Sequence, residues 1–224
     1  MDINKIENLG LDRILKRGSG EVLAEQDDAL LIRDRVSGAY MLACEDTELG
    51  IRLLEQHCGC ECNLLMVSNE ILGREAFKRF NFSEMMDCYQ VAYFGEKPVP
   101  DDSISVRVAD EHDLPMLIEN YDMISPDELK EVVTRKNILL GYSQERLIGF
   151  IGEHLEGSMG ILYVFPEYRH KGFGSALQSH FIIKTMEEGN IPFGQVEKEN
   201  HASLCLQKKL GMSRSDNLIV WMWK

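Results

Sequence analysis

The chain has 224 residues, of which 44% are hydrophobic and 27% are charged, and its formal net charge is −13. This composition is typical of a globular protein, with either one large domain or two domains of about 100 residues each. Both halves are acidic, which argues against a nucleic-acid-binding protein, because such proteins normally present a basic face. No stretch approaches the roughly 18 uncharged apolar residues of a membrane span, and the charged N-terminus lacks the apolar run of a signal peptide. We therefore expect a cytoplasmic protein.

The first half of the chain predicts a short α+β unit that ends at a clear break. The stretch 95–103, GEKPVPDDS, holds two prolines and several acids and cannot continue a helix or a central strand. We place a domain boundary there, at about residue 100, which gives domains 1–99 and 100–224. The elements expected before the break are a hairpin (29–45), a helix (46–59), a strand (62–68), a helix (70–80) and a strand (86–94).

The second half predicts a longer succession of the same kinds of element. Its clearest helix start is at 125–133, where a serine cap, a proline at the first helical position and acids in the first turn follow one another. The elements expected are a strand (103–109), helices (110–121 and 125–133), a hairpin (137–143 with 146–155), a strand (159–165), a helix (174–189), a strand (191–199), a helix (201–211) and a last strand (217–223).

The order of elements in the first half repeats part of the order in the second. A shift of 130 residues lays Gly59 on Gly189 and Lys78 on Lys208, with few other identities. Two interpretations stay open: an ancient duplication, or two α+β halves that are alike in pattern only.

The stretch 169–174, RHKGFG, carries the strongest chemical signal. It lies between an expected strand and an expected helix, so the unpaired N–H groups of the helix N-terminus face outward, where they favour an anion. Gly172 and Gly174 lack the Cβ atoms that would keep a phosphate from these amides, and the neighbouring basic side chains add positive charge. The stretch therefore indicates a phosphate site, most readily for a diphosphate. It matches neither the dinucleotide-binding pattern nor the Walker P-loop, and the alternative is a glycine-rich turn with solvated basic residues.

Together with its flanks, LYVFPEYRHKGFGSAL, this stretch resembles the acyl-CoA-binding motif of the GNAT superfamily of N-acetyltransferases. The likeness continues in 196–212, VEKENHASLCLQKKLGM, and in the opening strand and helix, SVRVADEHDLPML. It covers about 103–224 and is nearest to the subgroup of glycine N-acyltransferase-like proteins. It implies a GNAT-like α+β fold, with a mixed, mostly antiparallel sheet flanked by helices, preceded by a degenerate GNAT-like half.

The resemblance also implies which residues bind acetyl-CoA, the co-substrate. One strand would pair with the pantetheine arm and direct an N–H at the thioester carbonyl, the loop after it would hold the diphosphate, and an asparagine would contact the arm again. The residues so implied are Leu162, Tyr163, Val164, Arg169, His170, Lys171, Gly172, Phe173, Gly174, Asn200, Ser203 and Lys209.

One position departs from the family pattern. Many members carry a tyrosine seven residues after the asparagine, as the general acid toward the CoA thiolate, whereas this chain has Gln207. Glutamine can donate a hydrogen bond but cannot supply a proton, which puts the protonation step in doubt. A base is needed as well, because an amine with a pKa near 10 is mostly protonated at pH 7. We rank Glu156 first, because it lies at the entry of the cofactor-binding strand, and Glu197 second; the other candidates are Glu153 and His154.

The first half holds no comparable loop. Its nearest stretch, RVSGAY at 35–40, lies in an expected hairpin turn, so we expect no CoA there. We propose that this half forms one wall of the acceptor site. The stretch HCGCEC at 57–62 has poor spacing for zinc, and we interpret its cysteines as small buried thiols rather than metal ligands.

These observations favour a direct transfer of an acetyl or other acyl group from CoA to a primary amine of a small molecule, in a ternary complex. We expect no nucleic-acid or membrane partner, and either a monomer or a homodimer. The alternative function is a CoA-binding regulatory or interaction module with weakened catalysis.

Overall fold

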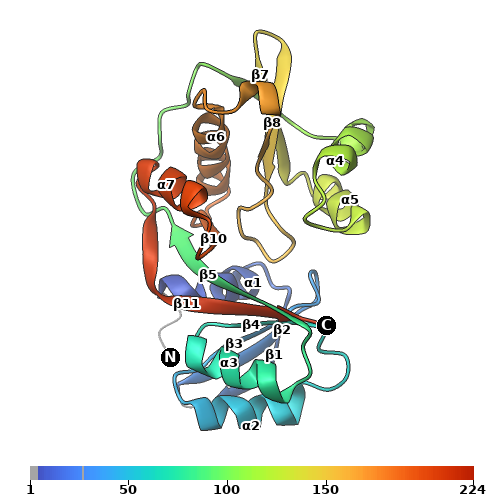
Figure 1. Ribbon diagram of the computed structural model, residues 1–224, viewed down its shortest axis with the longest axis vertical. Helices are drawn as coiled ribbons and strands as arrows, with labels where there is room; N and C mark the ends of the chain where they lie inside the picture. Colours follow the sequence, from blue (N-terminus) through green and yellow to red (C-terminus); the bar gives the residue numbers. More distant parts are fainter. Residues whose placement is uncertain (1–4, 27) are drawn as a thin grey trace. The chain divides into compact units, whose positions relative to one another are not determined.

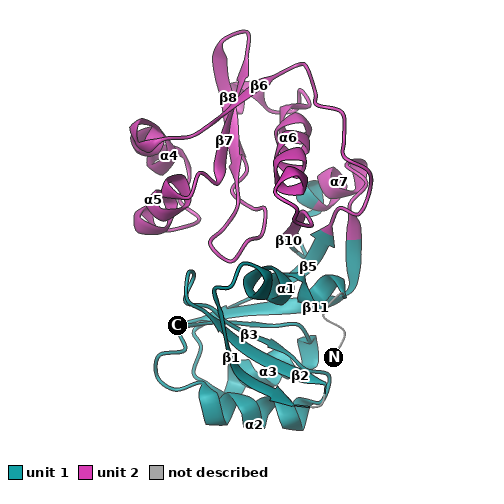
Figure 2. Cartoon of the chain, turned by 180° about the vertical axis from the view of Figure 1, so that it is seen from behind, with its two compact units in different colours: residues 1–91, 195–203, 214–224 teal, residues 92–194, 204–213 magenta. Residues whose placement is uncertain are grey.

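The computed structural model describes residues 5–26 and 28–224, which fold into two compact units (Figures 1 and 2). Unit 1 takes the chain up to Val91 and then residues 195–203 and 214–224, whereas unit 2 takes residues 92–194 and 204–213. These units differ from the predicted domains 1–99 and 100–224. The reason is strand pairing, because two strands from the C-terminal quarter of the chain complete a sheet with strands of the first half.

Unit 1 is built on a seven-stranded sheet with the order β1-β2-β3-β4-β11-β5-β10. Strand β1 pairs with β2, β2 with β3 and β4 with β11 in antiparallel fashion, whereas β3 runs parallel to β4, with Tyr40 opposite Leu65 and Leu42 opposite Val67. The elements are η1 (Ile6–Asn8), α1 (Leu9–Lys16), β1 (Gly20–Gln26), β2 (Ala29–Asp34), β3 (Tyr40–Ala43), α2 (Thr47–His57), β4 (Leu64–Val67), α3 (Glu70–Arg79), β5 (Glu84–Ala92), β10 (Phe193–Glu197) and β11 (Ser213–Trp223).

Helices cover both faces of this sheet, so its inner strands are apolar on both sides. Helices α2 and α3 lie on one face and α1 lies on the other (Figure 1). In β3, for example, Leu42 packs with the α2 and α3 side chains, whereas Met41 packs with Leu11 and Ile14 of α1. Continuous apolar runs such as 29–32 follow from this burial on two sides.

Unit 2 is built on a four-stranded sheet with the order β6-β7-β8-β9. Helices α4 and α5 lie on one side of β7 and β8, and α6 lies on the other (Figure 1). Neighbouring strands in this sheet pair in antiparallel fashion. The elements are β6 (Ser105–Val108), η2 (Glu111–Asp113), α4 (Leu114–Asn120), α5 (Pro126–Thr134), β7 (Ile138–Ser143), β8 (Arg146–Gly152), β9 (Tyr163–Val164), η3 (Pro166–Tyr168), α6 (Phe173–Glu187) and α7 (His201–Lys209), of which α7 lies in unit 2 from residue 204.

The predicted α+β class with a mixed, mostly antiparallel sheet is confirmed, and so is the start of α5, where Ser125 Oγ accepts the N–H of Glu128 at 3.1 Å. Two elements went unpredicted, α1 and β1, because α1 is short and β1 alternates weakly and is half-exposed. The strand predicted over 159–165 is regular only at Tyr163 and Val164. Among the described residues, no helix is both long and apolar enough to cross a membrane.

Candidate active site

Strand β9 is the edge of the unit 2 sheet, and its pairing with β8 decides which backbone groups face outward. Phe165 N–H donates to Ile148 O, and Gly152 and Ile161 exchange both of their backbone hydrogen bonds. Because hydrogen-bonding direction alternates along a strand, Leu162 and Val164 turn their backbone groups away from β8. The Leu162 N–H donates to Gly160 O at 2.8 Å and Val164 O accepts Arg169 Nε, so the Leu162 carbonyl and the Val164 N–H are the groups that face outward. The predicted pantetheine strand therefore has an outward-facing hydrogen-bonding edge.

Gly149 in β8 makes the close approach of β9 possible. A Cβ at this position would lie far inside van der Waals distance of Tyr163 O, and 3.0 Å from Val164 Cα. Any other residue here would push the two strands apart.

Strands β9 and β10 belong to different sheets. The segment before β9 and the start of β10 are nevertheless adjacent within unit 2. An isolated parallel bridge joins Met159 to Gly194, and Met159 N–H donates to Phe193 O at 2.8 Å. Beyond this bridge no ladder continues between the two strands.

The loop after β9 is exposed, and its basic side chains fold back onto the backbone that precedes them. Arg169 Nε donates to Val164 O at 2.9 Å, and its guanidinium lies 5.6 Å from the centre of the Tyr163 ring. Lys171 Nζ donates to Glu167 O at 2.8 Å. These contacts hold two cations beside the outer edge of β9.

Helix α6 begins without a side-chain cap. Gly172 is its N-cap residue and has a φ of 90°, in the left-handed region, where no carbonyl or hydroxyl side chain can cover the first N–H groups. A Cβ built on Gly172 would have no neighbour within 4 Å, so the space in front of the helix is open. The predicted arrangement of 169–174 is thus present: an open helix N-terminus with basic residues around it.

A second group of polar side chains lies at the turn between β8 and β9. His154 Nδ1 is 3.8 Å from Glu128 Oε1 of α5, and its side chain is 23% exposed. Burial opposes the charged imidazole, but the Glu128 carboxylate and the negative charges of Glu156 and Glu153 outweigh it and raise the pKa of His154. Glu128 was not predicted as a site residue, because its place in the first turn of α5 already explained it as a helix-dipole partner.

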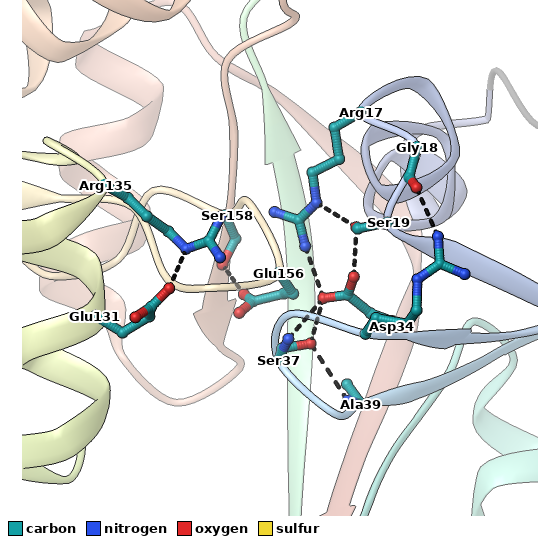
Figure 3. A network of polar contacts seen from close by, with 11 residues as sticks. Arg17, Gly18, Ser19, Asp34, Ser37, Ala39, Glu131, Arg135, Glu156 and Ser158 are labelled. Carbon is teal, nitrogen blue, oxygen red and sulfur yellow. Dashed lines mark hydrogen bonds and ion pairs between the residues drawn. The ribbon is translucent and has the colours of Figure 1, made fainter.

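Glu156, the first predicted base, is buried and accepts a hydrogen bond from the Ser158 hydroxyl (Figure 3). Glu153 is buried at 3% exposure, and it pairs with Met159 through an isolated bridge. Glu197, the second predicted base, is an exposed residue of β10 in unit 1.

Gln207 is buried in α7 and its amide is paired with another glutamine. Gln178 Nε2 of α6 donates to Gln207 Oε1 at 2.5 Å, and Gln207 Nε2 donates back to Gln178 Oε1 at 3.2 Å. Two mutually satisfied amides join the two helices, so the geometry gives this side chain a structural role in unit 2. Gln178 was missed because a glutamine on a helix carries no sequence signal for such a pair.

The three remaining predicted cofactor residues are spread over both units. Asn200 and Ser203 belong to unit 1, where Asn200 Oδ1 accepts Ser203 N–H at 3.0 Å and caps the start of α7. Lys209 is exposed in the last turn of α7 in unit 2. Capping accounts for the asparagine without a ligand.

The corresponding place in unit 1 is closed. Strands β3 and β4 pair in parallel without parting, and α2 is capped by Asp46, whose carboxylate accepts the N–H groups of Glu48 and Leu49. A carboxylate thus occupies the N-terminus that an anionic ligand would need.

The stretch 35–40 lies in the turn between β2 and β3, as predicted, and it surrounds a buried carboxylate (Figure 3). Asp34 is 0% exposed and accepts hydrogen bonds from Ser19 Oγ (2.5 Å), Ser37 N–H (2.9 Å), Ser37 Oγ (2.6 Å) and Arg17 Nη2 (2.6 Å). Burial alone would raise the pKa of Asp34, but these donors and the Arg17 charge lower it. This network is a structural element of unit 1.

The HCGCEC stretch follows α2. Cys62 is buried, Cys58 is half-buried and Cys60 is exposed, so the prediction of buried thiols holds for part of the set. Hydrogen bonding with Cys62 raises the pKa of Cys58 and lowers that of Cys62. Within 5–26 and 28–224, no three His, Cys, Asp or Glu side chains form a group that could hold a metal ion.

Comparisons with known proteins bear on the fold. Residues 139–221 match the family model described as FR47-like protein. No curated protein sequence matches the chain.

Several solved structures share the fold at low sequence identity. A Drosophila protein has a TM-score of 0.65 at 16% identity, covering 88% of this chain and 74% of its own. A GCN5-related N-acetyltransferase-like protein from Streptococcus suis has a TM-score of 0.61 at 14% identity, covering 96% and 92%. A GCN5-related N-acetyltransferase from Kribbella flavida has a TM-score of 0.59 at 9% identity, covering 98% and 94%. The chain therefore shares the fold of these GNAT structures, and residues 139–221 are similar to the FR47-like family model.

Proposed function

We propose that the chain is an acyl-CoA-dependent N-acyltransferase that moves an acetyl or other acyl group to a primary amine of a small molecule. One observation carries the proposal: the outward-facing edge of β9 leads directly into the open, uncapped N-terminus of α6. An extended amide arm needs a strand edge, and a diphosphate needs a helix N-terminus with small residues and nearby cations. The strand edge and the helix N-terminus lie within twelve residues of each other in the sequence, from Val164 to Ser175.

In this proposal the carbonyl of Leu162, and that of Val164 once Arg169 turns away from it, accept the N–H groups of the pantetheine amides. The Val164 N–H is suited to the thioester oxygen, because a fixed backbone donor stabilises the oxyanion of a tetrahedral intermediate. The N–H groups at the start of α6 hold the diphosphate, and Arg169 and Lys171 turn from their backbone acceptors toward it. Binding both reactants makes the attack effectively intramolecular, which removes a large entropic cost.

The binding half of the proposal is tested by a matched pair of glycine substitutions at the two ends of α6. Gly172 and Gly189 both have positive φ (90° and 76°), and neither would place a Cβ within 4 Å of another atom. Gly172→Ala and Gly189→Ala should therefore cost similar stability, about 1 kcal/mol each. Calorimetric titration with acetyl-CoA should show about a tenfold loss of affinity for Gly172→Ala alone.

A ligand series sharpens the same experiment. Acetyl-CoA and acetyl-pantetheine share the arm but differ in the diphosphate. Arg169→Ala and Gly172→Ala should weaken acetyl-CoA and leave acetyl-pantetheine unchanged. Equal loss for both ligands, or no acetyl-CoA binding by the unsubstituted protein at millimolar concentration, would refute the proposed site.

The catalytic half is tested by thiol release. The protein is incubated with acetyl-CoA and a panel of amino acids, polyamines and aminoglycosides, and free CoA thiol is measured. We expect amine-dependent release with at least one class, since a CoA thiolate, with a thiol pKa near 8.5, is a tolerable leaving group even without a tyrosine donor.

A second candidate function is a CoA-binding module without turnover. The burial of Gln207 in the amide pair with Gln178 favours it, because position 207 then offers no proton to the departing thiolate. Acetyl-CoA binding in the micromolar range with no thiol release for any amine would select this alternative.

We further propose that unit 1 is a degenerate GNAT-like half that does not bind CoA. The paired β3 and β4 and the Asp46 cap support this, because they leave neither a free strand edge nor an open helix N-terminus. Acetyl-CoA titration should accordingly give one site per chain.

A further inference from the structure

We propose that His154 is the general base of the acyl transfer and that Glu128 is a positioning residue that holds its imidazole. The inference rests on the proposed N-acyltransferase function and departs from the ranking by sequence, which put Glu156 first. It is carried by the placement of one imidazole between a carboxylate and the entry of β9.

The two ring nitrogens of His154 have different surroundings. Nδ1 faces Glu128 Oε1 at 3.8 Å. Nε2 lies against Gly160. A Cβ added to Gly160 would lie 2.5 Å from Cδ2 of the ring, well inside van der Waals distance. The Glu128 carboxylate lies at ion-pair distance from Nδ1, where its charge favours a proton on the imidazole, and Nε2 is the nitrogen on the side of Gly160. Gly160 is exposed and lies two residues before Leu162, whose carbonyl faces away from β8.

The backbone around the ring is fixed. His154 N–H donates to Ser158 O at 2.8 Å, Gly157 N–H donates to His154 O at 2.9 Å, and Gly160 N–H donates to Gly152 O at 3.1 Å. The Tyr121 hydroxyl, from the segment between α4 and α5, donates to Gly160 O at 3.2 Å. The ring therefore has a defined position rather than that of a solvated surface histidine.

The charged and titratable groups around the ring come from three segments. Glu128 faces it from α5, Glu153 and Glu156 belong to its own turn, and Tyr121 closes the side toward α4. Burial raises the pKa of Tyr121 to about 12, so it stays neutral, and the three carboxylates raise the pKa of His154. A base with a raised pKa suits the removal of a proton from an ammonium group near neutral pH.

The other candidates are less well placed. The carboxylate of Glu156 is buried and bonded to the Ser158 hydroxyl, and Glu153 is buried at 3% exposure. Neither presents a nitrogen or oxygen to an exposed backbone position as His154 does.

The proposed step balances as follows. The acceptor ammonium gives one proton to His154 Nε2, and the freed nitrogen forms a C–N bond with the thioester carbonyl carbon. The C–S bond breaks, its electron pair leaves with sulfur, and the thiolate takes up the second nitrogen-bound proton. The products are the amide, the CoA thiol and an imidazolium that returns its proton to water.

The first test titrates the imidazoles of the full-length protein by NMR, with the His154 signal identified by its loss in His154→Gln. We expect a pKa above the ordinary value of about 6.5, and a lower pKa in Glu128→Gln. This measurement needs no turnover. A His154 pKa that does not respond to Glu128→Gln would overturn the assigned pairing.

The second test follows kcat/KM against pH with two acceptor amines of different pKa. For both amines we expect kcat/KM to increase with pH, with the midpoint of the increase at the NMR-determined pKa of His154. Glu128→Gln should shift this midpoint to lower pH. His154→Gln should lower kcat/KM by about 100-fold and remove this rise, with the Kd for acetyl-CoA unchanged. Gly160→Ala, which crowds the ring, should lower kcat/KM as His154→Gln does. His112→Gln, at an exposed histidine of unit 2, should have the kcat/KM of the unsubstituted protein.

The outcomes separate the two proposals. Turnover in His154→Gln within about threefold of normal, with an unchanged pH profile, overturns the base role and leaves the proposed function standing. Absence of turnover in the unsubstituted protein overturns both.

Discussion

The buried Asp34 network gives a stability prediction that can be calculated from the structure. Asp34→Ala removes a carboxylate that is 0% exposed and accepts four hydrogen bonds, one of them from Arg17, whose side chain is only 23% exposed. Breaking a buried ion pair costs about 3–5 kcal/mol, because the remaining charge is left without compensation. Since Arg17 can still reach water, we expect the lower end, about 3 kcal/mol. Asp34→Asn keeps the shape and one acceptor, so about 2 kcal/mol is expected.

The assay is urea unfolding followed by tryptophan fluorescence. Trp221 and Trp223, the two tryptophans of the chain, both lie in β11 of unit 1, so the signal reports on the unit that contains Asp34. The matched control is Asp12→Asn, which breaks the i,i+4 pair with Lys16 (2.7 Å), whose lysine side chain is 61% exposed. This surface pair should contribute less than about 0.5 kcal/mol.

The pH dependence follows from the sign of the shift. Because the native pKa of Asp34 is lowered, its stabilisation is fully present above the unfolded-state pKa of about 3.9 and is lost as pH falls through the native value. The difference between the unsubstituted protein and Asp34→Asn should therefore be constant from pH 7 to about 5 and shrink below about pH 4. The reasoning would be refuted if both Asp34 variants lost no more free energy of unfolding than Asp12→Asn does.

Two further predictions concern unit 2. Gly149→Ala should lower the free energy of unfolding by about 2 kcal/mol or more, since its Cβ collides with Tyr163 O, whereas Gly59→Ala, in open space, should change it by less than about 0.5 kcal/mol; thermal unfolding by circular dichroism compares them. Gln178→Leu should cost about 1–3 kcal/mol by removing both hydrogen bonds between the two buried amides, and adding Gln207→Leu should recover part of the loss. Calorimetry of the two single variants and the double variant decides this, and simple additivity would argue against the amide pair.

Local chemistry made parts of the fold predictable. Ser125 and Pro126 indicate the start of α5. Gly172 indicates a helix N-cap with left-handed backbone, a conformation that few other residues adopt. These signals depend on neighbours in the chain, so one sequence is enough to detect them. The open helix N-terminus after residues 169–172 was predictable for the same reason, because its strand, glycines and basic residues are contiguous.

Other features depend on contacts between distant positions and could not be predicted. The pairing of β11 with β4 and of β10 with β5, which moves the unit boundaries, is invisible to periodicity, because a strand shows its faces but not its partners. Glu128 and His154 lie 26 positions apart, on a helix and a turn, and each has an ordinary local explanation. The sequence ranking put Glu156 first by its proximity to the strand predicted to bind the cofactor, whereas the base proposed from the structure is His154.

The position of β11 between β4 and β5 has a consequence for synthesis on the ribosome. A nascent chain that has emerged only as far as β9 holds five strands of the unit 1 sheet, yet β4 and β5 still lack the strand that separates them. These two strands must wait, with unpaired edges, until residues 213–223 leave the exit tunnel. We expect the nascent chain to depend on chaperones for longer than a protein with contiguous domains, and neither unit to be obtainable by cutting the gene at a single point.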